Sequence, residues 1–428
     1  MRRITRASIA VGFFTVTLTL IATILVLNYV NFSPRINRPL DTDFSVNEPL
    51  FIRTLESLLG PGFTEGNSVT PLRNGDEIFP AMLSAIRQAE YTINFETFVY
   101  WTGSIADIFA EALAERARNG VQVRILLDAV GSSRMDEALI DLMVDAGAVV
   151  ERFRTVRWYN MDRLNHRTHR KLLIADGKVG FTGGVGIGDE WLGDAQDENH
   201  WRETHFEFRG PVVAQLQAGF ADHWMMARQE IIQGYEFFPK LKPEGEIMAQ
   251  AFNSSAEGGA ESIRTLFLVS IAAAKETVYI GTPYFVPDDF LLDTLLEARL
   301  RGVEIEVLTQ GEHGDSAITQ AVSTAKWGDL LKAGVRIYKF DPTLYHTKVL
   351  IVDERWVSIG SANFDNRSFL FNDENNVNIL NREFAAEMLS QFEKDKARSS
   401  EVSFQEWLDR PWYERVLEWV SSTIESQV

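Results

Sequence analysis

Apolar and polar positions repeat the same order of secondary-structure elements in two stretches of the chain. In the first stretch, the pattern predicts a helix around residues 82–86, a strand at 91–100, a helix at 105–119 and a strand at 121–128. In the second stretch, it predicts a helix ending at Lys275, a strand at 277–280, a helix at 289–301 and a strand at 303–309. Helices that alternate with strands indicate an α/β fold of two tandem halves, each a mixed sheet flanked by helices.

A long uncharged segment lies near the N-terminus. Arg2, Arg3 and Arg6 precede it, and residues 7–34 contain no charged side chain. Its apolar centre, residues 9–27, is long enough to form a transmembrane helix. No small-x-small cleavage site follows, so an uncleaved membrane anchor over residues 1–32 is favoured over a cleaved signal peptide. The basic residues favour a cytoplasmic N-terminus, which places the rest of the chain outside the cytoplasm, on a bacterial plasma membrane.

The remaining chain is too long for one ordinary hydrophobic core, since the protein has 428 residues. Residues 33–47 are polar, carry two prolines and predict a linker. We assign residues 48–238 to the first half and residues 239–428 to the second. The join falls where Pro239, Pro243 and Gly245 interrupt the pattern.

Charge and composition exclude some classes of protein. A hydrophobic content of 45% with 24% charged residues is typical of a folded globular protein. The net charge of −18 argues against a nucleic-acid partner, because such proteins neutralise phosphates with Lys and Arg. The chain has no cysteine, so it forms neither disulfides nor thiolate metal sites.

One short motif occurs twice with the spacing H-x-K-x4-D. Its members are His169, Lys171 and Asp176 in the first half and His346, Lys348 and Asp353 in the second. Alternate residues of a strand share a face, so the imidazole and the ammonium of each copy point the same way. If the two copies face each other, they form one pocket with two histidines and two lysines.

Such a pocket is suited to phosphodiester chemistry. A neutral imidazole attacks phosphorus, a protonated imidazole supplies a proton to the leaving alcohol, and two lysines stabilise the phosphoryl oxygens. This set requires neither a metal nor another cofactor. Asp176 and Asp353 complete the two catalytic motifs, and an acid at a strand end more often has a positioning role. The two histidines would titrate as a coupled unit.

Further polar residues follow the second motif. Ser361 and Asn363 would place a hydroxyl and an amide near the phosphate oxygens, and Glu374 is the candidate to orient His346. Glu203 is the corresponding candidate to orient His169. The first half carries Gly184 and Gly186 at the positions of Ser361 and Asn363, so both polar side chains are missing there.

The paired motifs and their surroundings resemble the phospholipase D superfamily, and specifically its bacterial cardiolipin synthase branch. The resemblance covers almost all of the chain after the N-terminal segment, and includes residues 181–184, 187–191, 282–288 and 360–368. It implies two halves related by a pseudo-twofold axis around one shared site. It also implies a ping-pong reaction through a phosphatidyl-histidine, with phospholipids, phosphatidylglycerol above all, as substrates.

The chain departs from the resemblance in two places. Gly186 stands where the family usually has Asn, which puts the choice of acceptor in doubt. One apolar N-terminal segment stands where the family usually has two membrane helices, which leaves the side of the membrane open.

Three functions remain open at this point. The leading one is a membrane-anchored phosphatidyltransferase that joins two phosphatidylglycerols into cardiolipin and releases glycerol. The second is a phospholipase D-type phosphodiesterase, either a lipid hydrolase or, against the acidic charge, a nuclease. The third is a lipid-binding protein without turnover, which the two glycines favour and the four intact His and Lys residues oppose. We expect phospholipids and a membrane as partners and no nucleic acid. The sequence makes no prediction of oligomeric state.

Overall fold

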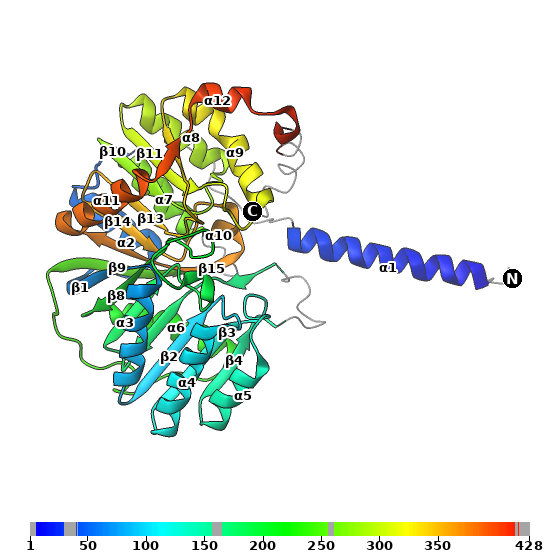
Figure 1. Ribbon diagram of the computed structural model, residues 1–428, viewed down its shortest axis with the longest axis vertical. Coiled ribbons are helices and arrows are strands. Elements are labelled where there is room, and N and C mark those ends of the chain that lie inside the picture. The colour runs from blue at the N-terminus through cyan, green and yellow to red at the C-terminus, as the bar shows by residue number, and fades with distance from the viewer. Residues whose placement is uncertain are drawn as a thin grey trace.

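The computed structural model describes residues 6–29, 40, 42–155, 165–255, 261–415 and 418. The first helix, α1 (Arg6–Tyr29), extends away from a rounded body that contains all other elements (Figure 1). Across these described residues, no helix combines the length and the apolar character needed to cross a membrane. Residues 1–5 and 30–32 of the predicted anchor, and most of the predicted linker, lie outside the described residues.

The first half contains the predicted alternation of helices and strands. Its elements in chain order are β1 (Thr64–Arg73), α3 (Asn74–Gln88), β2 (Thr92–Thr97), α4 (Ser104–Arg118), β3 (Gln122–Asp128), α5 (Glu137–Asp145), β4 (Val149–Phe153), β5 (Arg167–Thr168), β6 (Leu172–Ala175), β7 (Val179–Gly183), β8 (Thr204–Arg209) and α6 (Val213–Arg228). The two helices and two strands predicted between residues 82 and 128 are confirmed, with small shifts at their ends.

The second half repeats this order. Its elements are β9 (Ile247–Ser254), α7 (Ser262–Ala272), β10 (Thr277–Gly281), α8 (Asp289–Leu300), β11 (Glu304–Gln310), α9 (Ala317–Lys332), β12 (Arg336–Phe340), β13 (Val349–Val352), β14 (Trp356–Gly360), α10 (Asn366–Leu370), β15 (Asn372–Leu380), α11 (Arg382–Lys396), β16 (Ser399–Glu401) and α12 (Phe404–Asp409). Asp288 begins α8 and Asn381 begins α11 by accepting a backbone N–H of the first turn.

The strands form one continuous sheet, to which each half contributes the mixed sheet that we predicted for it. Their order is β16-β12-β11-β10-β13-β14-β15-β9-β1-β8-β7-β6-β2-β3-β4, and β1 pairs antiparallel with both β8 and β9. Read outward from the contact between β1 and β9, the two directions give corresponding strands as far as β12 and β4, and β16 adds a further strand beyond β12. The order therefore has the pseudo-twofold symmetry of two equivalent halves, seen one above the other in Figure 1.

Both faces of the sheet are buried, because alternate residues of the central strands enter different cores. In β6, Leu173 packs with α3 and α4, whereas Leu172 and Ile174 pack with α6. The core around α6 also contains α11 and strands of the second half. This shared core joins the two halves over much of the sheet, so the site between them is held by packing as well as by strand pairing.

One helix at the start of the described body packs against the half that follows later in sequence. The helix α2 (Pro49–Leu59) buries Phe51 and Leu55 in the core of the second half, where Phe51 contacts Trp356 edge to face. The boundary that we predict at residue 48 assigns this helix to the first half. Chain order and packing differ here because the apolar face of α2 is buried against α7.

Candidate active site

Each motif histidine lies on a segment that crosses to the other half of the molecule. Strand β5, just before His169, pairs with β15 of the second half, and the His169 N–H donates to the Asp373 carbonyl at 2.8 Å. Likewise, the His346 N–H donates to the Arg202 carbonyl of the first half at 2.8 Å. Glu374 follows Asp373 and Glu203 follows Arg202, so these two backbone contacts place a glutamate beside each histidine.

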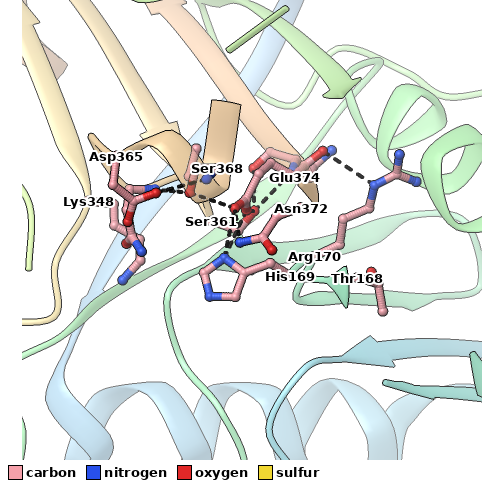
Figure 2. Close-up of polar contacts among 12 residues, drawn as sticks. Thr168, His169, Arg170, Lys348, Ser361, Asp365, Ser368, Asn372 and Glu374 are labelled. Atoms are coloured by element: carbon pink, nitrogen blue, oxygen red, sulfur yellow. Dashed lines mark hydrogen bonds and ion pairs between the residues drawn. The ribbon is translucent and has the colours of Figure 1, made fainter. Parts of the chain in front are cut away.

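The histidine–glutamate pairs are therefore crossed between the halves. The Nδ1 atom of His169 lies 2.9 and 3.0 Å from the two carboxylate oxygens of Glu374, and Nδ1 of His346 lies 2.5 Å from Oε2 of Glu203. The pairing predicted from sequence spacing, in which each glutamate serves the histidine of its own half, is wrong. In Figure 2 the other ring nitrogen of His169 points away from Glu374. A carboxylate on Nδ1 leaves Nε2 available for chemistry.

The two glutamates have unequal surroundings. Glu374 accepts hydrogen bonds from the hydroxyls of Ser361 at 2.5 Å and Ser368 at 2.8 Å, and from the Asn372 amide at 3.3 Å (Figure 2). Ser361 thus contacts the glutamate, although we predicted a position near the phosphate oxygens.

Glu203 accepts a hydrogen bond from the Thr204 N–H at 2.9 Å besides its contact with His346. A Cβ atom on Gly184 would lie 2.3 Å from Oε2 of Glu203. The glycine at the position of Ser361 therefore makes room for the carboxylate. As a result, Glu374 shares its negative charge among more donors than Glu203 does.

Both histidines line a single cavity of about 280 Å³. Aromatic side chains of the first half form one part of its wall. Polar and charged residues from both halves form the rest. The lining residues are Phe98, Val99, Trp101, Arg167, His169, Lys171, Trp191, Trp201, Tyr284, Asp315, Thr319, His346, Asn363, Asp365, Arg367 and Asn372. Asn363 lies at the cavity as expected, and its Oδ1 atom has no hydrogen-bond partner among the described residues.

Burial dominates the titration of the site. It lowers the pKa of His169 to about 4, against the opposing attraction of Glu374, and it lowers the pKa of His346 to about 4 with help from Lys348. Burial also lowers the pKa of Lys171 to about 7 and that of Lys348 to about 8. Both imidazoles are therefore neutral at pH 7, which leaves a nitrogen lone pair for attack.

The two lysines are buried and held by the backbone of their own motifs. Nζ of Lys171 donates to the carbonyl of His169 at 2.7 Å, and Nζ of Lys348 donates to the carbonyl of His346 at 2.6 Å. Lys348 also lies 3.2 Å from Nδ1 of His346. These contacts fix each ammonium next to its histidine.

The motif aspartates lie at the far ends of the motif strands. Asp176 accepts the backbone N–H groups of Tyr91 at 2.7 Å and Thr92 at 2.9 Å, where β2 begins. Asp353 accepts the corresponding N–H groups before β10, including Glu276 at 2.8 Å. Neither carboxylate lines the cavity. Their place among the catalytic residues is wrong, and they position strands, because four buried strand residues separate each from its lysine.

Three aromatic rings that the sequence patterns did not single out contact the histidines. Phe98 meets His169 edge to face at 5.2 Å between centroids, and Trp191 and Trp201 meet His346 at 5.5 and 5.7 Å. These rings exclude water from the imidazoles, which explains the low histidine pKa values.

Three or more His, Cys, Asp or Glu side chains do not gather into a metal-binding group anywhere in the described ranges.

Comparison with known proteins places this site in a family. Residues 82–224 and 267–396 match the family described as "Cardiolipin synthase, PLD-like domain". The chain therefore belongs to this family and is an enzyme of the phospholipase D superfamily.

Full-length relatives agree with this assignment. The chain is 35% identical over 363 residues to the major cardiolipin synthase of Bacillus subtilis, covering 84% of this chain and 75% of the relative. It is 36% identical over 341 residues to cardiolipin synthase A of Pseudomonas syringae, covering 79% and 71%. The crystal structure of a phosphatidylserine synthase from Haemophilus influenzae has a TM-score of 0.66 at 13% identity, covering 88% of this chain and all of that one, and shows the same fold.

Proposed function

We propose that this enzyme transfers a phosphatidyl group from one phosphatidylglycerol to a second, which forms cardiolipin and releases glycerol. The observation that carries the proposal is the pair of histidines that face one cavity, each held at Nδ1 by a buried glutamate. The names of the relatives, which are cardiolipin synthases at 32–36% identity over most of the chain, support the substrate class.

In the first step, Nε2 of His169 attacks the donor phosphorus. The P–N bond forms, the bond from phosphorus to the glycerol oxygen breaks, and His346, which gains a proton once the bound anionic lipid raises its pKa, supplies the proton that the departing glycerol takes up. In the second step, His346 removes the proton from a hydroxyl of the acceptor lipid. That oxygen attacks phosphorus, the P–N bond breaks, and His169 is regenerated.

The two half-sites differ in the contacts of their glutamates. Glu203 accepts fewer hydrogen bonds than Glu374, but burial and then Lys348, which lies 3.2 Å from Nδ1 of His346, lower the pKa of that imidazole against the attraction of Glu203. In the proposed reaction His346 is the group that carries a proton, and His169 is the group that stays neutral. Lys171 and Lys348 stabilise the phosphoryl oxygens in both steps.

We also propose that α1 anchors the enzyme in a bacterial plasma membrane, with the catalytic body outside the cytoplasm. Residues 7–34 carry no charge, and Phe13, Phe14 and Val16 of α1 are exposed apolar side chains on a helix that packs against no part of the body in Figure 1. The basic residues before the helix support the orientation. A full-length chain that stays soluble after cell lysis would contradict the anchor.

The product spectrum tests the proposed reaction. Purified enzyme is incubated with phosphatidylglycerol labelled in its headgroup glycerol and in its acyl chains. Cardiolipin and free glycerol in equal amounts are the expected products. Phosphatidic acid in place of cardiolipin would show a hydrolase, and no turnover would show a binding protein.

A further inference from the structure

The charged residues that line the cavity do not follow the pseudo-twofold symmetry of the fold. Arg167 and Arg367 both line it, one from β5 of the first half and one from α10 of the second. The motif repeat places Leu344 and Glu190 at the corresponding positions, 177 residues away in each case, and neither of these lines the cavity. One region of the wall is thus cationic, while the aromatic region contains Trp191 and its neighbours.

The two guanidinium groups lie close together. Arg367 is near enough to lower the pKa of Arg167, after the larger effect of burial. The Arg367 side chain donates to the side-chain and main-chain oxygens of Asn165 at 3.0 and 3.3 Å, and Arg167 donates to the carbonyl of His166 at 2.6 Å. These acceptors orient the two arginines.

Two buried carboxylates act on the pair, Asp128 from outside the cavity and Asp365 from its wall. Asp128 attracts Arg167, and its own oxygens accept the N–H groups of Val130 and Gly131. Asp365 attracts Arg367 and begins α10 by accepting the Ser368 N–H at 2.8 Å. Both carboxylates are thus also occupied in holding backbone turns.

The spacing of the cationic region from the nucleophile has a simple basis. Arg167, His169 and Lys171 are alternate residues of one extended segment, and all three side chains reach the cavity. Alternate residues along a strand are about 6.6 Å apart. Two phosphates joined through the carbons of one glycerol are separated by a comparable length. A phosphate attached to His169 would therefore have a second phosphate, one glycerol away, at the arginines.

From this asymmetry we infer that Arg167 and Arg367 form an anion subsite that binds the phosphodiester of the acceptor lipid. The inference rests on the proposed phosphatidyl transfer and names its acceptor class, an anionic phospholipid with a free headgroup hydroxyl. Guanidinium groups suit this task because they bind phosphate oxygens in a bidentate manner. The subsite holds the acceptor hydroxyl near the covalent intermediate and so favours it over water and uncharged alcohols.

A partition experiment tests the subsite. Full-length enzyme in mixed micelles receives phosphatidylglycerol together with labelled free glycerol. The covalent intermediate then yields cardiolipin when the lipid is the acceptor, or labelled phosphatidylglycerol when the uncharged glycerol is. Both products share the donor step, so their ratio reports the acceptor step alone.

Arg167→Gln and Arg367→Gln should each lower the ratio of cardiolipin to glycerol exchange about tenfold or more. Arg367→Lys, which keeps the charge, should recover part of the ratio. Arg209→Gln removes an exposed guanidinium outside the cavity and should leave the ratio unchanged.

An unchanged ratio in both Arg→Gln variants would overturn the inference, as would an equal loss of both products in the Gln and Lys variants. Wild-type enzyme that makes neither product would overturn the proposed function, and the subsite with it. Wild-type exchange and cardiolipin synthesis with an unchanged ratio in the variants would remove the subsite alone.

Discussion

The two half-sites share one geometry and differ in the environment of their carboxylates. In the pair formed by His169 and Glu374, the glutamate is surrounded by two hydroxyls and an amide. In the pair formed by His346 and Glu203, Gly184 leaves space for the carboxylate, which accepts a hydrogen bond from the Thr204 N–H besides its contact with the histidine. The two copies of the motif thus hold their carboxylates differently, although burial lowers the pKa of both imidazoles to about 4.

The largest expected effect comes from removing either histidine. His169→Ala and His346→Ala should each lower phosphatidyl transfer roughly 10⁴-fold or more, since one removes the nucleophile and the other the proton donor. A donor lipid with p-nitrophenol as its leaving group separates the two, because this group departs without a proton. His346→Ala should then release nitrophenol at nearly the wild-type burst rate, and His169→Ala should not. The reverse result would exchange the roles of the two histidines.

The crossed pairing predicts the next largest effects. Glu203→Gln and Glu374→Gln should each lower transfer about 10- to 100-fold, because each removes the charge that orients a histidine. With the nitrophenyl donor, Glu374→Gln should slow the burst and Glu203→Gln should leave it almost unchanged. Pairing within each half would give the opposite pattern, so stopped-flow measurement of the burst decides between them.

The glycine and the serine at equivalent positions should respond differently to alanine. Gly184→Ala places a methyl group against Glu203 and should lower transfer about tenfold or more. Ser361→Ala removes one of several donors to Glu374 and should cost only a few-fold. A larger loss in Ser361→Ala than in Gly184→Ala, at equal thermal stability, would contradict the difference between the two carboxylates.

The pH profile of transfer should reflect the buried groups. Activity should rise as the pH increases through about 4, where the nucleophilic imidazole loses its proton, and fall through about 7 to 8, where the lysines lose theirs. His346, which is protonated in the complex with the anionic lipid, loses its proton on the same alkaline side. Lys171→Arg should move the alkaline limb upward by about one pH unit or more, because guanidinium stays charged. Lys178→Arg, outside the cavity, is the control and should leave the limb in place.

The smallest expected effect is that of a chelator. EDTA should leave transfer within about twofold of its original rate, since two lysines stabilise the phosphoryl oxygens in the proposed reaction. Activity that is lost in EDTA and restored by a divalent ion would show that the lysines do not suffice.

Much of the fold could be predicted from periodicity, because buried strands and amphipathic helices have patterns that can be recognised locally. The order of strands and helices around residues 82–128 and 277–309 was predicted in this way. The joining of the halves through β1 and β9 could not be predicted, since both strands lie outside the repeated stretches and pair across a large sequence distance. The packing of α2 on the second half depends equally on tertiary contacts.

In the site, too, some features follow from a local sequence motif and others depend on contacts between distant segments. Spacing identified His169, His346, Lys171 and Lys348 as residues of one pocket, and all but Lys348 line its wall. The assignment of glutamates failed because spacing along the chain favours a partner in the same half, whereas backbone pairing of β5 with β15 brings in Glu374. We predicted Asp176 and Asp353 as part of the catalytic motifs because they complete the H-x-K-x4-D pattern. The motif strands carry both carboxylates away from the cavity that the histidines line.

Each histidine is oriented by a glutamate of the other half, so catalysis requires that the two halves be in contact. Either half in isolation would possess an imidazole whose orienting carboxylate belongs to the other polypeptide segment. A chain severed between α6 and β9 would consequently gain activity only on reassembly of both fragments. Loosening of the contact between the halves would separate both histidines from their glutamates at once.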